Sequence, residues 1–462
     1  MENTARKLET ASERGNAADE KKKDAFRPQT VFLGLQHVLA MDLFIPPMIL
    51  AGMLSFSVAD SALFIQMTFI ACGLATLIQA GLAMKLPVMQ GPSFVPISAL
   101  AVIGSTSGVS VMIGSLIPGA LLISLLGYPF KLFSKTVKKF IPPVVAGTVI
   151  VVVGISLMPS AINAIYTAEG KTGPNMLVAF LTAAVLIFCM YVGEKSQTKL
   201  QYVKVVSVIL ALSVGSIAAS FYGLVDFSSA GKAAWFQMPS IFAFGKPAFD
   251  WNAILIMLAI YFIIMIETTG TWFTVSKVTG EHLDNKRLDR GALGEGLGCF
   301  AGSFLGGTPV TGYSSNAGII AITGVKSRKP IIIGGGILVI LGMMPKLMNI
   351  IASIPAAVVN SVFAIICIVI MMNGFKVIKE VPFTERNMLV IGVSIMAAMF
   401  AVLMPADILS GLPQLVTYFV SSGTAVGAIA ALVLNVILPQ KPEDCGLVKE
   451  PSVTLKLERG NV

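Results

Sequence analysis

Three acidic residues lie inside long apolar stretches of the sequence: Asp42, Glu267 and Glu295. A charge at the centre of a bilayer costs at least about 2.5 kcal/mol on insertion scales, so such residues commonly serve ion or substrate pathways. Glu267, in YFIIMIETTGTWFTVS, is the strongest candidate. Its carboxyl group could bind and release a proton during transport, or donate a hydrogen bond to a polar substrate. The alternative is a structural carboxyl bonded to neighbouring backbone.

Two further residues join Glu267 and Glu295 as candidates for proton coupling or gating. Asp42 follows His37 by five residues, so on one helix their side chains point about 140° apart. The two are therefore no proton relay within that helix. We expect Asp42 either to function in coupling or to pair with another helix. His37 is expected to hold its helix to a neighbour, and Glu295 to act in gating or in a structural network.

Two apolar stretches contain too many helix breakers for plain helices: LPVMQGPSFVPIS, residues 86–98, and GGTPVTGYSSNAG, residues 306–318. Irregular backbone at membrane depth must be buried in protein or line a cavity. Hydroxyl, amide and free N–H groups can bind the edge of a planar heterocycle, and a phenylalanine can stack on it. The candidate substrate-binding residues here are Ser93, Phe94, Ser314, Ser315 and Asn316. Some of these are expected only to cap broken helices.

The composition is that of a polytopic helical membrane protein. Of 462 residues, 55% are hydrophobic and only 12% are charged, about half the usual charged share. This excludes a soluble enzyme, a disordered chain and a disulfide-stapled domain. Five cysteines without a CxxC pair and only two histidines predict neither a metal site nor a cofactor. The formal charge of +9 is spread over short loops, so no nucleic-acid partner is expected.

Fourteen apolar stretches are predicted to cross the bilayer. They lie near 31–54, 61–83, 86–103, 111–130, 141–160, 175–193, 203–223, 253–275, 291–306, 309–323, 330–345, 352–373, 387–404 and 410–438. Eighteen lysines and arginines lie in loops after even-numbered stretches and four in loops after odd-numbered ones. Because cytoplasmic loops are enriched in cations, both termini are expected in the cytoplasm, with the protein in a bacterial-type inner (plasma) membrane.

The two breaker-rich stretches are the third of each set of seven, and they align Pro87 with Pro309 and Ser93 with Ser315. Since seven is odd, the second set enters from the opposite side, and paired broken helices point to a transporter's binding site. We therefore predict an N-terminal tail (1–30), a first repeat (31–224), an extracytoplasmic linker (225–252), an inverted second repeat (253–438) and a C-terminal tail (439–462). Glycines spaced by four in GEGLGCFAG, from position 294, predict close helix packing.

These motifs together resemble the nucleobase–ascorbate transporter family, the xanthine and uracil permeases. The resemblance covers essentially the whole apolar region. It rests on Gln36-His37 in LGLQHVLAM, QGPSFVPIS at 90–98, Glu267 with the following Thr-Thr-Gly, and GEGLGCFAGSFLGGTPVTGY leading into SSNAGIIAITGVKSR. It implies fourteen segments in two inverted sevens, with a core domain (including segments one, three, eight and ten) moving against a gate domain (five to seven and twelve to fourteen). It also implies cation-coupled nucleobase uptake, often by a homodimer.

The resemblance assigns substrate binding to Glu267, and its third-segment aromatic corresponds to Phe94. Ser315 stands where purine members usually have Gln and uracil members Glu, and Asn316 matches the following Asn. Thr271, four residues after Glu267, is a further candidate substrate-binding residue and replaces an Asp or His often found at that position, and Asp42 replaces an aromatic. Ser315 is too short for the same bidentate contact, which leaves room for a larger base or a bridging water.

A secondary transporter that imports a nucleobase by symport is therefore expected, with a purine favoured and no enzymatic activity. A proton is favoured over sodium because one buried carboxyl suffices for it. The alternatives are a uracil or pyrimidine permease and an anion exchanger of the sulfate-permease type. The deep charges are acidic, which argues against an anion.

Overall fold

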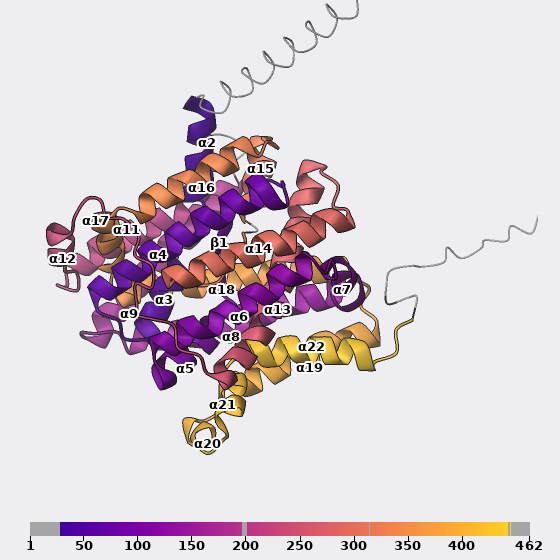
Figure 1. Ribbon diagram of the computed structural model, residues 1–462. Coiled ribbons are helices and arrows are strands. Elements are labelled where there is room, and N and C mark those ends of the chain that lie inside the picture. The colour runs from indigo at the N-terminus through magenta and orange to yellow at the C-terminus, as the bar shows by residue number, and fades with distance from the viewer. Residues whose placement is uncertain (1–27, 196–200, 314, 442–443, 445–462) are drawn as a thin grey trace, which may run out of the picture.

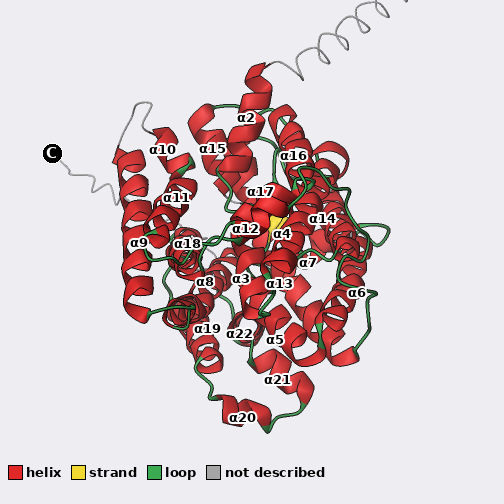
Figure 2. Ribbon diagram, turned by 90° about the vertical axis from the view of Figure 1, so that its left-hand side faces the viewer, coloured by secondary structure: helices red, strands yellow, loops and turns green. Residues whose placement is uncertain are grey.

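The computed structural model describes residues 28–195, 201–313, 315–441 and 444. Most of the two predicted tails lies outside these residues. Apart from two three-residue strands, the described elements are helices packed into a bundle (Figures 1 and 2).

Seven of the described helices are long and apolar enough to cross a membrane, and two bent pairs raise the number to nine. The seven are α4 (Val58–Thr76, continued by the π-helical segment Leu77–Ala83), α6 (Val109–Gly127), α8 (Pro143–Tyr166), α9 (Thr172–Lys195), α13 (Trp251–Thr279), α18 (Ala356–Ile378) and α19 (Glu385–Val402). The bent pairs are α16 (Lys329–Gly342) with α17 (Pro345–Ala352), and α21 (Gln414–Val420) with α22 (Gly423–Ile437). This confirms a polytopic helical membrane protein, whereas the count of fourteen segments stays a prediction.

The remaining helices are shorter or more polar. They are α2 (Pro28–Leu39), α3 (Ile45–Met53), α5 (Ile97–Ser107), α7 (Phe133–Phe140), α10 (Gln201–Val205), α11 (Ser207–Ser220), α12 (Ser228–Lys232), α14 (Asn285–Leu305), α15 (Ser315–Thr323) and α20 (Ala406–Ser410).

Both predicted broken segments are broken in the structure. Each contains a short strand followed by a short helix: β1 (Gln90–Pro92) precedes α5, and β2 (Val310–Gly312) precedes α15. The strands pair antiparallel, with Gly91 opposite Thr311. The prolines and glycines of these segments prevent a continuous helix, so each strand supplies the hydrogen-bonding partner that the other needs.

A third break was not expected. The apolar stretch 31–54 is divided into α2 and α3, with Asp42 in the connection. The adjacent Pro46 and Pro47 lie in the first turn of α3, where a missing N–H costs nothing, but a helix arriving from residue 42 could not continue through them. The Asp42 carbonyl accepts a hydrogen bond from the Ile45 N–H at 3.0 Å.

The helices that carry the two later acidic residues have well-defined ends. Asp250 caps α13 by accepting a hydrogen bond from the Ala253 N–H at 2.8 Å. Asp284 caps α14 through the Arg287 N–H at 2.7 Å. Helix α14 ends at Leu305, and the capping residue Gly306 adopts the left-handed conformation (φ 80°) that glycine reaches without a Cβ clash. These caps fix where each helix begins relative to the strands.

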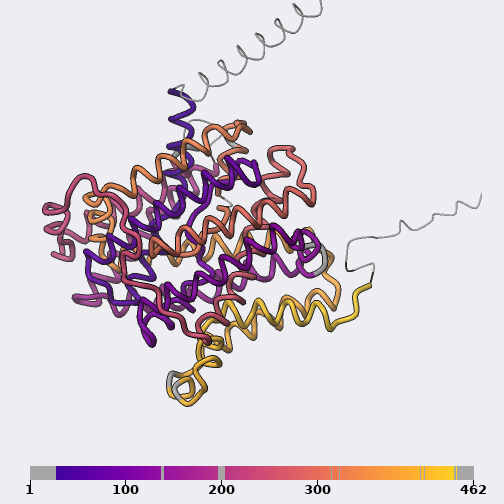
Figure 3. Tube along the Cα trace, in the orientation of Figure 1, coloured from indigo at the N-terminus to yellow at the C-terminus, as the bar shows by residue number. Residues whose placement is uncertain are grey.

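Helices from the two halves of the chain pack in matched pairs. Helix α14 packs on α6 as α16 packs on α4, and α19 packs on α8 as α9 packs on α18. If every segment is replaced by the segment seven places away in the predicted order of fourteen, the contact α14–α6 becomes α4–α16, and the contact α19–α8 becomes α9–α18. The contacts α8–α18 and β1–β2 are unchanged by this replacement. In Figure 3 the orange segments of the second half accordingly run beside indigo and purple segments of the first. This is the arrangement expected of two inverted sevens.

The pairs fall into two groups. The core group comprises α2–α6, α13–α17 and both strands; the gate group comprises α8–α11 and α18–α22. Figure 2 shows α8, α9, α11 and α18 on one side and α4, α6, α14 and α16 on the other. The groups meet where α13 contacts α8, α21 and α22, where α3 contacts α18, and where α5 contacts α21. Any substrate route between the groups must run along these contacts.

Candidate functional site

The two strands and α13 satisfy one another's backbone. The Ser93 N–H donates to the Pro309 carbonyl at 2.9 Å, and the Tyr313 N–H donates to the Met89 carbonyl at 3.0 Å. The Gly312 N–H donates to the Thr268 hydroxyl of α13 at 3.0 Å. All of β1 and β2 is buried. The irregular backbone is therefore held inside the core group, as its depth in the membrane requires.

Ser93 and Glu267 meet at this crossing. The Ser93 hydroxyl donates a hydrogen bond to Glu267 Oε2 at 2.9 Å, and Thr311 lies beside the same carboxyl group. Ser93 is fully buried, whereas Glu267 is only partly buried. The strands thus fix the carboxyl group, while part of the Glu267 residue stays exposed. Such a carboxyl can accept from or donate to a polar ligand according to its protonation.

Open space lies beside α15, at the start of which Ser315 is exposed. A Cβ added to Gly318, one turn later, would meet no atom within 4 Å. On α13, a Cβ at Gly270 would lie 3.8 Å from Ile150 of gate helix α8, so the gate group is in contact with α13 close to Glu267. One face of α15 is therefore open, whereas α13 beside Glu267 packs against the gate group. Ser314, also predicted for this site, lies outside the described residues.

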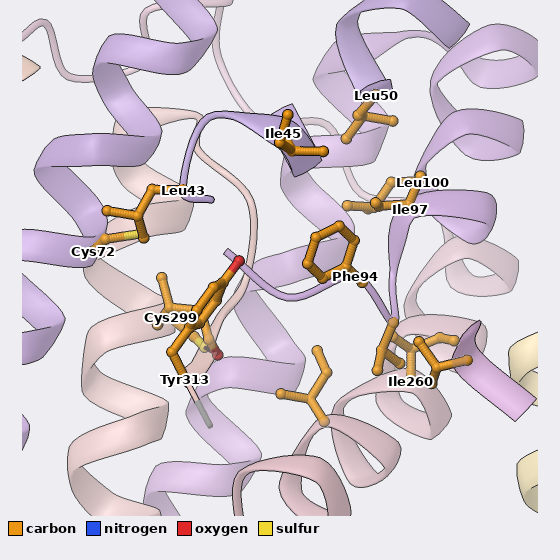
Figure 4. Close-up of a cluster of buried hydrophobic side chains, with 14 of the residues drawn as sticks. Leu43, Ile45, Leu50, Cys72, Phe94, Ile97, Leu100, Ile260, Cys299 and Tyr313 are labelled. Atoms are coloured by element: carbon orange, nitrogen blue, oxygen red, sulfur yellow. Dashed lines mark hydrogen bonds between the residues drawn. The ribbon is translucent and has the colours of Figure 1, made fainter. Parts of the chain in front are cut away.

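Phe94 follows Ser93 directly and is stacked on Phe363 of α18, with ring centroids 5.8 Å apart and planes 10° from parallel. Figure 4 shows Phe94 among Ile45, Ile97 and Ile260. The ring pair therefore joins the core group to the gate group beside the Ser93–Glu267 contact. Phe363 is missing from the sequence prediction, because a phenylalanine in an apolar helix carries no signal of its partner.

Thr271 and Asn316 are buried against the strand backbone. A Cβ at Gly312 would lie 3.4 Å from Thr271 Cγ2, so Thr271 packs behind β2. Asn316 Nδ2 donates to the Pro87 carbonyl at 2.7 Å. Both residues thereby position the two broken segments.

The third acidic residue lies deeper in the core group. Glu295 is 1% exposed, and its Oε2 accepts a hydrogen bond from Gln79 Nε2 at 3.2 Å. The same amide donates to the Gly291 carbonyl at 3.1 Å. Thr268 and Gln90 also lie beside Glu295. Glu267 lies close enough to Glu295 for the two carboxyl groups to interact electrostatically.

Gln79 and Gln90 are also absent from the sequence prediction. Gln79 lies in the π-helical end of the second segment, a distortion that often marks functional positions. Gln90 is fully buried, and neither atom of its side-chain amide has a hydrogen-bond partner within the described residues. A buried glutamine inside an apolar stretch was the available signal, because such a group needs a partner.

The first segment closes over the strands. His37 is 1% exposed and lies beside Asn316 of α15. Asp42 is partly buried and lies near Tyr313, whose hydroxyl donates to the Pro92 carbonyl at 3.1 Å. The structure thus brings Asp42 and His37 to the strand crossing but not to the Ser93–Glu267 hydrogen bond.

A polar cluster, Ser107, Asn252, Gln414 and Tyr418, joins the core and gate groups at the end of the bundle next to the 225–252 linker. The Tyr418 hydroxyl lies 2.6 Å from Ser107 Oγ and accepts from Gln414 Nε2 at 2.8 Å. Asn252 Nδ2 donates to Gln414 Oε1 at 3.0 Å. We call these four residues the linker-side latch. At the opposite end the exposed ion pair Lys277–Glu380, with a 3.2 Å N–O distance, joins α13 to the end of α18.

Comparisons with known proteins agree with this architecture. A sequence model described as "Permease family", that of the xanthine/uracil permeases, matches residues 28–406. The chain is 31% identical over 432 residues to the uric acid permease PucK of Bacillus subtilis, covering 91% of this chain and 98% of the relative. It is 30% identical over 420 residues to the xanthine permease of B. subtilis, covering 88% and 93%.

Among solved structures, the transmembrane domain of a cyanobacterial bicarbonate transporter, BicA, superposes with a TM-score of 0.60 at 15% identity, covering 85% of this chain and 97% of that domain. At this identity the likeness concerns the fold alone, and it confirms the transporter architecture. The match of the permease model over most of the chain confirms a transport protein rather than an enzyme. The chain therefore belongs to the xanthine/uracil permease family and is a multi-pass membrane transporter.

Proposed function

We propose that the protein imports a nucleobase, with a purine favoured over a pyrimidine, by cation symport through alternating access. The observation that carries the proposal is the Ser93–Glu267 hydrogen bond at the crossing of the two broken segments. It places a carboxyl group where the strands, α13 and the gate group meet. The relatives named for uric acid and xanthine support a purine.

In this proposal the base is held by polar groups at its edge and by a ring on its face. Glu267 and Ser93 hydrogen-bond the base, Phe94 stacks on it, and Ser314 and Ser315 bind its other edge. Asn316 and Thr271 hold the two broken segments in place. One or two well-placed polar groups against an apolar wall give a small-molecule site its orientation.

The coupling ion in this proposal is a proton. Glu267 takes up the proton and Glu295 is a second proton-binding group reached through the contact at Thr268. Asp42 and His37 adjust this network from the first segment. Two carboxyl groups hydrogen-bonded by neutral side chains support protons over sodium, which prefers several oxygen ligands at once.

Import requires a fixed orientation and a moving pair of domains. We place both termini in the cytoplasm and the protein in a bacterial-type inner membrane, because the cations cluster in alternate loops. The linker-side latch then closes the outer side, and its opening admits the base. Assembly as a homodimer is proposed from the family resemblance.

A thermal-shift panel tests the binding proposal. Purified protein is melted with xanthine, uric acid, hypoxanthine, guanine, adenine, uracil, sulfate or bicarbonate. A ligand that binds only the folded state raises the Tm. We expect stabilisation by a purine, loss of that shift in Glu267→Gln, and retention in Glu169→Gln, which removes a carboxyl from a loop. Stabilisation by uracil alone would favour the pyrimidine alternative, and stabilisation by an anion alone would overturn the proposal.

A further inference from the structure

The stacked ring pair Phe94–Phe363 spans the boundary between the two helix groups. Phe94 is fixed between Pro92 and Pro96 in the core group, whereas Phe363 lies on α18 of the gate group. Phe94 is 5% exposed and Phe363 is fully buried. A movement of the core group relative to the gate group must therefore separate or shift these rings. The distance between the two rings accordingly depends on how far apart the two groups lie at the site.

The rings are too close to admit a third ring. A base held between them needs van der Waals contact on both faces, at about 3.5 Å each, hence about 7 Å between the outer rings. The observed centroid distance is 5.8 Å with nearly parallel planes, and the planes of two parallel rings lie no further apart than their centroids. The rings must therefore separate until their planes are about 7 Å apart, and neither ring needs to rotate because the planes already lie parallel.

Ser93 places this gap at the site. It is the residue before Phe94, and its hydroxyl bonds the Glu267 carboxyl group. A base whose edge binds Glu267 would present its face to Phe94. The opposite face of the base would then contact Phe363, the residue that now packs against the Phe94 ring.

We propose that Phe363 is the gate-side stacking residue of the site. The substrate ring is held between Phe94 of the core group and Phe363 of the gate group, and the two phenylalanines restack when the base leaves. This inference rests on the proposed function. Phe363 thus selects flat aromatic substrates, because stacking is sensitive to ring area and planarity and tolerant of which polar groups the ring carries.

The test compares base affinity in three variants. Phe363→Leu keeps apolar bulk but removes the ring, and Phe363→Trp keeps a ring. Phe64→Leu removes another fully buried phenylalanine of the core group, one in edge-to-face contact with Phe56 and Phe244. We expect Phe363→Leu to raise the Kd of xanthine roughly tenfold, with a smaller loss for monocyclic uracil. Phe64→Leu should lower the Tm without raising the Kd, and Phe363→Trp should retain the affinity.

A spectroscopic measurement keeps the test valid if Phe363→Leu does not fold. A base stacked on an indole quenches its fluorescence, so xanthine should quench Phe363→Trp more than the wild type with its three tryptophans. Wild-type Kd in Phe363→Leu, or no added quenching in Phe363→Trp, would overturn the role of Phe363. If base binding by the wild type and its loss in Glu267→Gln persist, the proposed function stands. A wild type that binds no base overturns both.

Discussion

The linker-side latch predicts how easily the core and gate groups separate. Tyr418 is 1% exposed, and its hydroxyl makes two short contacts, with Ser107 at 2.6 Å and Gln414 at 2.8 Å. Only the Ser107 contact joins the two groups, because Gln414 and Tyr418 lie in the same helix, α21. Tyr418→Phe removes it and keeps the ring. At about 1 kcal/mol net for a hydrogen bond, the closed arrangement should lose about 1 kcal/mol, which corresponds to roughly a fivefold increase in the equilibrium constant for opening.

Amide hydrogen exchange measures this change directly. Exchange from locally opened states scales with the opening constant, so residues 97–107 and 414–420 should exchange up to about fivefold faster in the variant. Residues 144–154, inside α8, should not change. The control is Tyr222→Phe, which removes the hydroxyl of an exposed tyrosine. Unchanged protection of both latch segments in Tyr418→Phe would refute the view that these hydrogen bonds hold the groups together.

Two further predictions concern stability. Gly154→Ala should lower the Tm by an amount equivalent to about 1–3 kcal/mol, because the added Cβ would lie 2.5 Å from the Cys367 carbonyl oxygen. The control is Gly392→Ala, whose Cβ meets no atom within 4 Å and which should be neutral or stabilising by up to about 1 kcal/mol. Equal Tm values for the two variants would contradict this prediction. Hydrogen bonds from the Thr384 hydroxyl and the Lys441 N–H hold the pKa of Asp444 below its usual 3.8. The ionised Asp444 therefore contributes its full stabilisation above pH 3.8, and this stabilisation is lost as the pH falls through the lower pKa of the folded state. The Tm difference between wild type and Asp444→Asn should accordingly shrink between pH 6 and pH 3. A constant Tm difference over this range would disprove the prediction.

The broken segments could be predicted because their cause is local. Prolines and glycines in 86–98 and 306–318 prevent helix whatever surrounds them, and membrane depth then requires that each segment find a partner. In the structure the partner of each segment is the other one, through the pairing of β1 with β2. The close packing predicted for the glycines of α14 also holds, since a Cβ at Gly298 would lie 2.6 Å from Ala75 Cβ.

The unpredicted features depend on partners distant in sequence. Phe363 and Tyr418 are ordinary residues of apolar helices, and only the packing of the gate group on the core group gives them a role. The break at Asp42 had a local signal in Pro46 and Pro47, but prolines are also tolerated in the first turn of a helix. Periodicity and composition could not decide whether the stretch 31–54 forms one helix or two. The contact of this stretch with the strand crossing decides for two helices.

Glu267 as the proton-coupled substrate carboxyl is the central claim, and uptake into proteoliposomes tests it most directly. Radiolabelled xanthine and uric acid are offered with and without an inward proton gradient to wild type, Glu267→Gln and Glu169→Gln. We predict gradient-driven accumulation by wild type and Glu169→Gln, with none by Glu267→Gln. Accumulation by Glu267→Gln at the wild-type level, with the wild-type dependence on the proton gradient, would contradict it.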